Sequence, residues 1–347
     1  MTRSRWFRTA TTALCTACLY VGAADAQPER VLFLGDSITQ GDANHRSFRY
    51  EAFKGLVDGG WTPGVDFDFV GSWQDHFGGD PTFPDYQGHA FDRDHEGHWG
   101  WRTWQVLEGE GVGDPPAGSG TGMLDEWLDG YTPDTAFVLL GTNDISRNNP
   151  SGRSWRPRDV APRIEQIVEV LQADNPDMRI LLGTLIPRQG SWFDTELAEF
   201  NAYLPGIAAN KTTATSTVEV LDLYAHLDWT EHTYDGTHPN EAGEAIIGRL
   251  VAAALLPPAP GDANRDGAVD LLDFDILAGH FGKASGATFG QGDFNGDGAV
   301  DLLDFDLLAS NFDSVSLAQL AALAVPEPAS GMLLWAGAWA ALRRRRR

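Results

Sequence analysis

The chain has 347 residues, of which 42% are hydrophobic, and it carries a formal net charge of −24. A hydrophobic fraction of this size supports a folded core and excludes global disorder. The acidic excess excludes nucleic acid as a partner, because phosphate binding requires clusters of lysine and arginine. The length allows one large domain or two smaller ones.

Residues 1–26 have the layout of a secretory signal peptide. Three arginines precede a largely apolar stretch at 9–21, and Ala24 and Ala26 provide the small-x-small cleavage pattern. The alternative is a short membrane anchor, but the apolar stretch is shorter than the ~20 residues that a span needs. Cys15 and Cys18 lie inside this segment, so the mature chain would contain no disulfide. We therefore expect a bacterial protein that is exported, either secreted or held at the cell envelope.

Between residues 27 and 256, mainly apolar runs alternate with helix-like stretches. Runs with the length and composition of buried parallel strands cover residues 31–34, 67–70, 136–140, 180–182 and 218–223. Helical apolar spacing covers residues 47–57, 161–172, 195–209 and 241–255. This alternation predicts an α/β domain with a parallel five-stranded sheet and helices on both faces. Residues 71–122 fit no regular element and are expected to form a long functional loop.

Three short motifs follow the expected strands. Ser37 follows the first strand in GDSIT, Asn143 follows the third in GTND, and Asp235 and His238 follow the fifth in DGTHPN. Taken singly, each motif would also suit a turn or a helix cap. Together they supply a nucleophile, an oxyanion donor, and a base with the carboxylate that orients it. Because ligands bind beyond the carboxyl ends of parallel strands, we expect Ser37 and Asn143 at one edge of the sheet. The combination predicts an esterase.

These motifs resemble the sequence blocks of the SGNH hydrolases of the GDSL type, over about residues 30–256. The resemblance implies a flavodoxin-like three-layer α/β/α fold with Ser37 as nucleophile. It also implies His238 as base, Asp235 as its orienting carboxylate, and Asn143 with the Ser37 N–H as oxyanion donors.

The glycine block of that family is best matched by EGHWGWRT at residues 96–103. This match makes Gly100 the remaining oxyanion donor, through its backbone N–H, with Gly97 as the alternative. Trp99 stands where a small residue, usually serine, is more common. Together with Trp101 and Trp104, it would either form a stacking floor for sugar rings or pack the loop onto the domain. His89, His95 and His98 lie nearby among acidic residues, but their spacing matches no zinc pattern.

Within the family, the motifs EGHWGW and DGTHPN are most similar to carbohydrate esterase family three, whose members remove acetyl groups from xylan. The resemblance implies an acetylated polysaccharide as substrate and no cofactor for catalysis. One alternative is a lipid or thioester hydrolase on the same fold. The other is a non-enzymatic surface protein that binds carbohydrate or mediates adhesion.

After a proline-rich linker at 257–261, residues 261–275 recur almost unchanged as residues 292–306. Each copy carries the Asp-x-Asn-x-Asp-Gly pattern of a calcium loop. The expected ligands are Asp262, Asn264, Asp266, Ala268, Asp270 and Asp273 in the first loop and Asp293, Asn295, Asp297, Ala299, Asp301 and Asp304 in the second.

The paired loops, with aspartate at the twelfth position and a leucine-rich helix after each, resemble a type I dockerin. This resemblance implies a small all-α calcium-binding domain at 262–313 and a cohesin-like protein as partner. Leucine pairs at 271–272 and 302–303 stand where many dockerins carry hydroxyl residues. A calcium-stiffened spacer is therefore the alternative.

The last residues, 325–347, combine a Pro-Glu-Pro motif, a short apolar run and five terminal arginines. This layout resembles the PEP-CTERM sorting tails of exported bacterial proteins, and it implies recognition by sorting machinery at the membrane. The alternative is a disordered basic tail.

Overall fold

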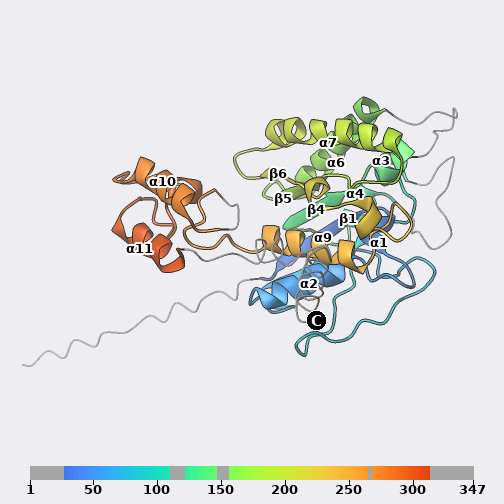
Figure 1. Ribbon diagram of the computed structural model, residues 1–347, viewed down its shortest axis with the longest axis horizontal. Helices are drawn as coiled ribbons and strands as arrows, with labels where there is room; N and C mark the ends of the chain where they lie inside the picture. The colour runs from blue at the N-terminus through green and yellow to red at the C-terminus, as the bar shows by residue number, and fades with distance from the viewer. Residues whose placement is uncertain (1–26, 110–121, 147–155, 265–267, 313–347) are drawn as a thin grey trace, which may run out of the picture.

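The computed structural model describes residues 27–109, 122–146, 156–264 and 268–312. The expected signal peptide with its two cysteines, the expected sorting tail and Asp266 of the first calcium loop lie outside these residues. Figure 1 shows a unit built around a sheet and a smaller unit that contains α10 (Leu271–His280) and α11 (Leu302–Asn311).

The sheet is parallel throughout. Its order is β2 (Phe67–Val70), β1 (Glu29–Gly35), β4 (Thr135–Leu139), β5 (Arg179–Gly183) and β6 (Val218–Leu221). A sixth strand of two residues, β3 (Glu96–Gly97), pairs with the end of β1. The five expected strands are all present, and the expected α/β class with a parallel sheet is confirmed. With β3 set aside, the order is that of flavodoxin-like sheets, in which the direction of winding reverses beside β1.

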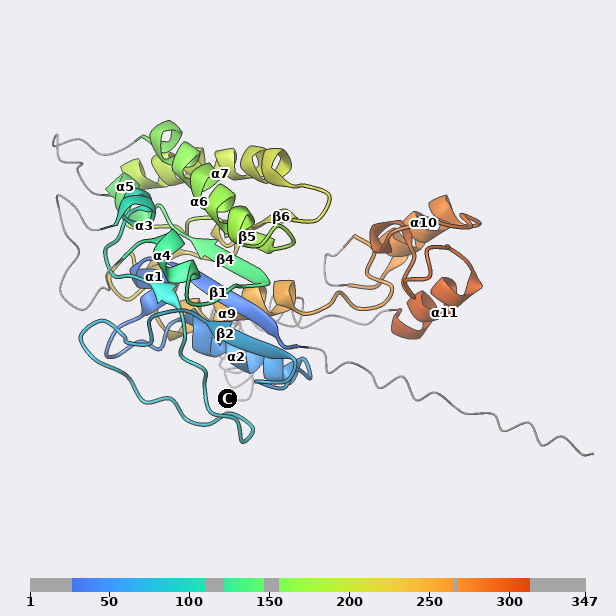
Figure 2. The same ribbon diagram turned by 180° about the vertical axis from the view of Figure 1, so that it is seen from behind.

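Helices cover both faces of this sheet. In Figures 1 and 2, α2 (Phe48–Asp58) and α9 (Glu241–Leu255) lie on one face, while α6 (Pro157–Asp174) and α7 (Ser191–Lys211) lie on the other. The shorter helices of the described residues are α1 (Ser37–Gln40), α3 (Thr103–Glu108), α4 (Leu124–Leu128), α5 (Thr142–Ser146) and α8 (Trp229–His232), with 3₁₀ turns η1 (Tyr224–His226) and η2 (Phe289–Gln291). The four helices expected from apolar spacing are present, with ends shifted by a few residues.

The expectation that residues 71–122 contain no regular element is wrong in part, because β3 and α3 lie within them. A two-residue strand has no periodicity to detect, and α3 has only six residues. In the described part of the segment, residues 71–109, one holding contact comes from α2. The buried Arg49 guanidinium of α2 donates to the carbonyl of Arg93 within the segment.

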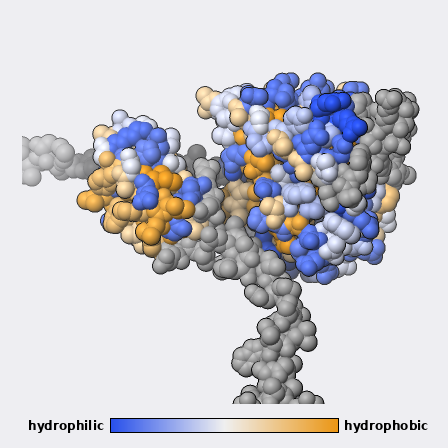
Figure 3. Space-filling view, turned by 45° about the horizontal axis from the view of Figure 1, so that its top comes forward, coloured by the Kyte–Doolittle hydropathy of each residue, from blue (hydrophilic) through white to orange (hydrophobic). Residues whose placement is uncertain are grey.

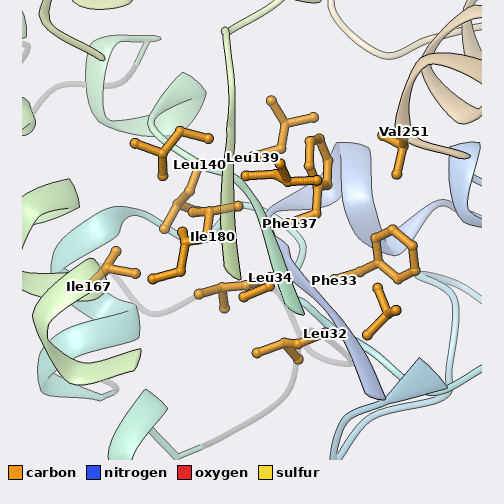
Figure 4. Packing of buried hydrophobic residues seen from close by; sticks show 14 of the residues in the cluster. Leu32, Phe33, Leu34, Phe137, Leu139, Leu140, Ile167, Ile180 and Val251 are labelled. Carbon is orange, nitrogen blue, oxygen red and sulfur yellow. The ribbon is translucent and has the colours of Figure 1, made fainter. Parts of the chain in front are cut away.

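The two faces of the sheet carry different side chains. Phe33 of β1 and Phe137 of β4 point toward the α2–α9 layer, where Phe48 and Val251 pack, while Leu34 and Ile180 lie near Ile167 of α6 (Figure 4). Successive residues of a strand point to opposite faces, so a strand buried on both faces is apolar without alternation. This is why the first expected strand appears in the sequence as the continuous run VLFL.

The smaller unit has its own hydrophobic cluster, which is separate from the cluster around the sheet. Its core includes Val269, Leu277, Val300 and Leu308, which occupy equivalent positions in the two repeats. Other apolar side chains of α10 and α11 remain exposed, and Figure 3 shows them gathered on this unit. Among the described residues, no helix combines the length and hydropathy that crossing a membrane requires.

Glu244 of α9 makes the stability of the larger unit depend on pH. Its buried carboxylate accepts the backbone N–H of Ser47 at 3.0 Å. Burial, with the negative charges of Glu51 and Asp42, raises the pKa of Glu244 to about 8. The folded chain therefore retains a proton that the unfolded chain has already lost, and stability falls as pH rises from about 4.5 through 8.

We expect Glu244→Gln to remove the loss of stability at high pH, because the glutamine amide carries no charge and its oxygen still accepts the Ser47 N–H. Its free energy of unfolding should match the wild type near pH 4.5 and exceed it by up to about 5 kcal/mol above pH 8. Urea unfolding across this pH range measures the difference. Glu199→Gln, exposed on α7 and not among the charges that raise the pKa of Glu244, is the control. A difference that stays constant with pH would contradict the assignment.

Candidate active site

The structure brings Ser37, His238 and Asp235 into a hydrogen-bonded line. The Nε2 atom of His238 lies 2.9 Å from the Oγ of Ser37, and its Nδ1 lies 2.7 Å from an Asp235 carboxylate oxygen. Ser37 opens α1 directly after β1, whereas the other two residues precede α9, about 200 positions later. This is the geometry in which a base accepts the hydroxyl proton while a carboxylate fixes the imidazole tautomer.

The Asp235 carboxylate also shapes the turn that carries His238. One of its oxygens accepts the backbone N–H groups of Thr237 and His238, and the other accepts the imidazole. Gly236 lies between them with a φ of 81°, a value that glycine adopts without strain. Asn240 then caps α9 by accepting from two first-turn N–H groups. The motif is therefore both a helix cap and the support of the histidine.

Asp235 remains ionised at neutral pH. Burial alone would raise its pKa, but the hydrogen bonds from the His238 backbone and imidazole, together with the imidazole charge, lower it below the usual range. The hydrogen bonds between the Asp235 carboxylate and His238 are consequently weakened only as pH falls through this lowered pKa. The Asp235 side chain is 42% exposed and that of His238 is 18% exposed, so water has access to the pair.

Asn143 lies at the same edge of the sheet as Ser37, because β1 and β4 are paired neighbours. Its side-chain amide nitrogen donates to Asp36 at 3.2 Å and to the carbonyl of Trp101 at 3.0 Å. The adjacent Asp144 is buried and accepts both the N–H and the hydroxyl of Thr103, at 2.9 and 2.7 Å. Burial raises the pKa of Asp144 to about 6. These contacts join the asparagine motif to the glycine block.

The two candidate glycines have different environments. Gly97 lies in β3, and its N–H donates to Nδ1 of His95 at 2.8 Å. A Cβ built on Gly97 would lie 2.6 Å from the backbone nitrogen of Gln40, so this glycine permits close packing beneath α1. Gly100 has a φ of 79° and lies in the turn before α3. The geometry thus gives Gly97 a packing role and leaves Gly100 as the candidate oxyanion donor.

The sequence of the larger unit matches the GDSL-like lipase/acylhydrolase family model over residues 33–246. The chain belongs to this family. A type I dockerin model matches residues 260–313, so the smaller unit is a dockerin type I domain. The match to the hydrolase family includes all the residues that converge on Ser37.

Three relatives illustrate the similarity. A multidomain esterase of Ruminococcus flavefaciens is 26% identical over 227 residues, which are 63% of this chain and 27% of that protein. The chain therefore spans about a quarter of this curated relative. A carbohydrate esterase family 3 structure from Talaromyces cellulolyticus is 27% identical, with a TM-score of 0.51 over 65% of this chain and 95% of that one. The structure of a serine-to-alanine mutant of an acetyl esterase with acetate ion is also 27% identical. Its TM-score is 0.50, and the match covers 65% of this chain and 93% of that one.

The structure favours packing for two of the three tryptophans around the glycine block, Trp101 and Trp99. Trp101 is fully buried. The ring of Trp99 already stacks on two protein rings, those of Phe77 and His238. Trp104, in α3, is half-buried. We therefore interpret Trp99 and Trp101 as part of the frame of the site.

The nearby histidines also take structural positions. His98 is buried, stacks on Trp127, and lies 2.9 Å from a carboxylate oxygen of the buried Glu96. Glu96 accepts the hydroxyl of Tyr131 as well. His95 is fully buried, and burial lowers its pKa well below the usual range. Among the described residues, no three histidine, cysteine or acidic side chains are grouped in a way that could hold a metal ion.

Several residues that shape the site give little or no signal in the sequence. Arg49 donates to the carbonyls of Thr39 and Gln40, and so fixes the end of α1 just beyond Ser37. Burial lowers the pKa of Arg49 to about 9. An arginine within an apolar helix stretch was the only signal in the sequence. Tyr234, next to Asp235, gave no signal, because its contacts come from distant segments.

We expect Gly97→Ala to lower both stability and any activity of the site. The added methyl group would collide with the backbone of α1 and displace Ser37, and overpacking of this kind costs about 1–3 kcal/mol. Thermal unfolding and ester hydrolysis measure the two effects. Gly206→Ala is the matched control, because a Cβ there meets nothing within 4 Å inside helix α7. Equal behaviour of the two variants would contradict the packing role of Gly97.

Proposed function

We propose that this chain is an exported serine esterase that removes acetyl groups from a polysaccharide, with acetylated xylan as the first candidate. The observation that carries the proposal is the line from Asp235 through His238 to Ser37. Ser37 Oγ attacks the acetyl carbonyl carbon while its proton passes to His238 Nε2. His238 then returns this proton to the departing sugar oxygen, which leaves an acetyl-serine.

Water completes the reaction. His238 accepts a proton from the attacking water, acetate is released, and Ser37 regains its proton. The Ser37 N–H, the Gly100 N–H and the Asn143 amide are proposed to stabilise the oxyanion of each tetrahedral intermediate. One such donor is worth about 3 kcal/mol of activation free energy. Because the Asn143 amide donates to Asp36 and Trp101, one of its hydrogens must turn to the oxyanion during the reaction.

The acetyl and polysaccharide specificity is supported by the relatives. The compared proteins include a carbohydrate esterase of family 3 and an acetyl esterase with acetate ion, each 27% identical to this chain. The type I dockerin domain adds to this support, because in this proposal it attaches the hydrolase to an assembly outside the cell, where polysaccharides occur.

We expect the full-length chain to release acetate from acetylated xylan and Ser37→Ala to reduce this release by at least about 10⁴-fold. Acetate assay of both proteins, with circular dichroism to verify folding, provides the measurement. Gly206→Ala serves again as a neutral control. Activity that survives in Ser37→Ala would refute the serine mechanism. Preference for long-chain esters would instead support a lipid hydrolase, and no activity on any ester would support a binding protein.

The dockerin domain is proposed to hold two calcium ions. Its loops offer carboxylate, amide and carbonyl oxygens, the donors that calcium prefers. In the second loop, Asp293 and Asp304 are buried, and no described lysine or arginine forms an ion pair with either. Their oxygens accept backbone N–H groups of the loop, including those of Gly296, Gly298 and Asp301. A divalent cation would offset the burial of these charges. The full set of proposed ligands is that expected from the sequence. Because no three acidic side chains of the described residues are grouped closely enough to hold a metal, those of the second loop would have to turn inward when calcium binds.

We expect calcium titration of the full-length chain to give two bound ions, and Asp304→Ala to reduce this number to one. Chelation should lower the unfolding temperature of the small unit alone, because the two units have separate hydrophobic clusters. Isothermal titration and scanning calorimetry measure both. The exposed Asp306→Asn, two positions further along α11, is the control. Two bound ions in Asp304→Ala would refute the ligand assignment.

A cohesin-like protein is the proposed partner of the dockerin domain. Support comes from the match to the type I dockerin model. The leucines that stand in place of hydroxyl residues at the start of α10 and α11 are exposed, with 59–68% of their surface accessible, so this contact would be apolar: Leu271, Leu272, Leu302 and Leu303. Figure 3 shows an apolar surface on this unit. Export through the N-terminal segment and sorting at the membrane through residues 325–347 remain parts of the same proposal.

A further inference from the structure

Five aromatic side chains form a series of stacked rings that contains His238. In order they are Phe77, Trp99, His238, Tyr234 and His45. Neighbouring ring centroids lie 4.4, 4.7, 5.7 and 3.9 Å apart, and the angles between their planes are 16°, 18°, 17° and 6°. We call this set the ring series. Its members come from loops that follow α1, β2, β3 and α8, so the whole fold is required to assemble it.

The two rings next to His238 have hydrogen bonds of their own, in addition to the backbone N–H of Tyr234, which donates to the His238 carbonyl at 3.0 Å. The Tyr234 hydroxyl donates to a carboxylate oxygen of Asp42 at 2.7 Å, and the other Asp42 oxygen lies 2.9 Å from Nδ1 of His45. Burial and the Asp42 carboxylate raise the pKa of Tyr234 above its usual range, so its hydroxyl remains a donor. The backbone N–H of Trp99 donates to the side chain of Gln40 at 2.7 Å.

The Asp235–His238 hydrogen bond alone holds the imidazole weakly. Asp235 is 42% exposed, so water competes with the imidazole for its carboxylate oxygens. The χ2 torsion of histidine is also broad, so the ring turns easily unless neighbours restrain it. Flat rings stacked nearly parallel to the imidazole provide this restraint.

We propose that Trp99 and Tyr234 are positioning residues that keep the His238 imidazole aligned with Ser37 and stabilise the imidazolium formed during the reaction. This inference rests on the proposed esterase function. Aromatic faces attract cations, so the restraint and the electrostatic effect act in the same direction. Trp99 occupies the position between His98 and Gly100, and its stacking gives that large residue a role beside the reacting groups.

Paired variants of the full-length chain test the proposal. Trp99→Leu removes the flat face and should lower kcat for 4-nitrophenyl acetate about tenfold, with KM changed by less than about twofold. Trp99→Phe restores a flat ring and should stay within about threefold of the wild type. Tyr234→Leu and Tyr234→Phe form a second pair. Trp61→Leu is the matched control, because Trp61 stacks on Phe67 at the opposite end of the strands.

A second measurement does not depend on turnover. The His238 Nδ1–H should give a proton resonance protected from water exchange in the wild type and in Trp99→Phe. In Trp99→Leu this resonance should broaden through faster exchange. If the wild type hydrolyses no ester, the esterase proposal fails, and this resonance still decides whether the ring series positions the imidazole.

The proposal is overturned if kcat and the Nδ1–H resonance are unchanged in both leucine variants. It is also overturned if Trp99→Leu raises only KM, and only for acetylated xylan, since Trp99 would then contact substrate. If Trp99→Leu fails to fold, as thermal unfolding would show, the Tyr234 pair decides, because Tyr234 is 40% exposed and its replacement leaves the core intact.

Discussion

The parallel pairing of β1 with β4 is the constraint on which the site depends. The winding of the sheet reverses beside β1, and the register places the ends of β1 and β4 side by side, with Gly35 opposite Leu139. Ser37 and Asn143 follow these two ends within four residues and therefore share one edge. The histidine motif reaches the same edge through the chain that follows β6, and α9 then returns along the face that α2 also covers.

Buried polar groups connect the loops above this edge. The Arg49 guanidinium donates to carbonyls of α1 and of the loop that follows β2. The Asp144 carboxylate accepts the backbone N–H of Thr103 at the start of α3. The Glu96 carboxylate accepts the backbone N–H of Ser72 and the hydroxyl of Tyr131. Each group would be costly to bury without its partners, so each demands a specific arrangement of backbone. Side chains of other elements thereby hold the loops at the site through hydrogen bonds. Because the reacting residues lie on these loops, their positions are fixed as well.

The sequence predicted the larger unit well wherever the signal was local. The five runs of apolar residues and α9 were found because strand burial and helical spacing leave periodic patterns. Ser37, Asn143 and the Asp235–His238 pair were predicted from motifs, and the structure brings them to one edge. The roles of Trp99, Tyr234 and Arg49 could not be predicted, because each depends on contacts between segments distant in sequence. A tryptophan in a loop has the same local signal whether it stacks on a sugar or on a histidine.

The dockerin domain was predicted in more detail, because its loops are formed by residues close together in the sequence. Its loops hydrogen-bond within themselves over a few residues: the Asp301 side chain caps α11, and Asp304 accepts the Asp301 N–H. Nearly all the information needed for such a loop lies within about twelve residues, so a repeated motif is sufficient to predict it. The hydrolase site is not encoded locally in this way, since Ser37 and His238 are 201 positions apart. Its motifs therefore identify the reacting groups, while the fold alone determines which rings surround them.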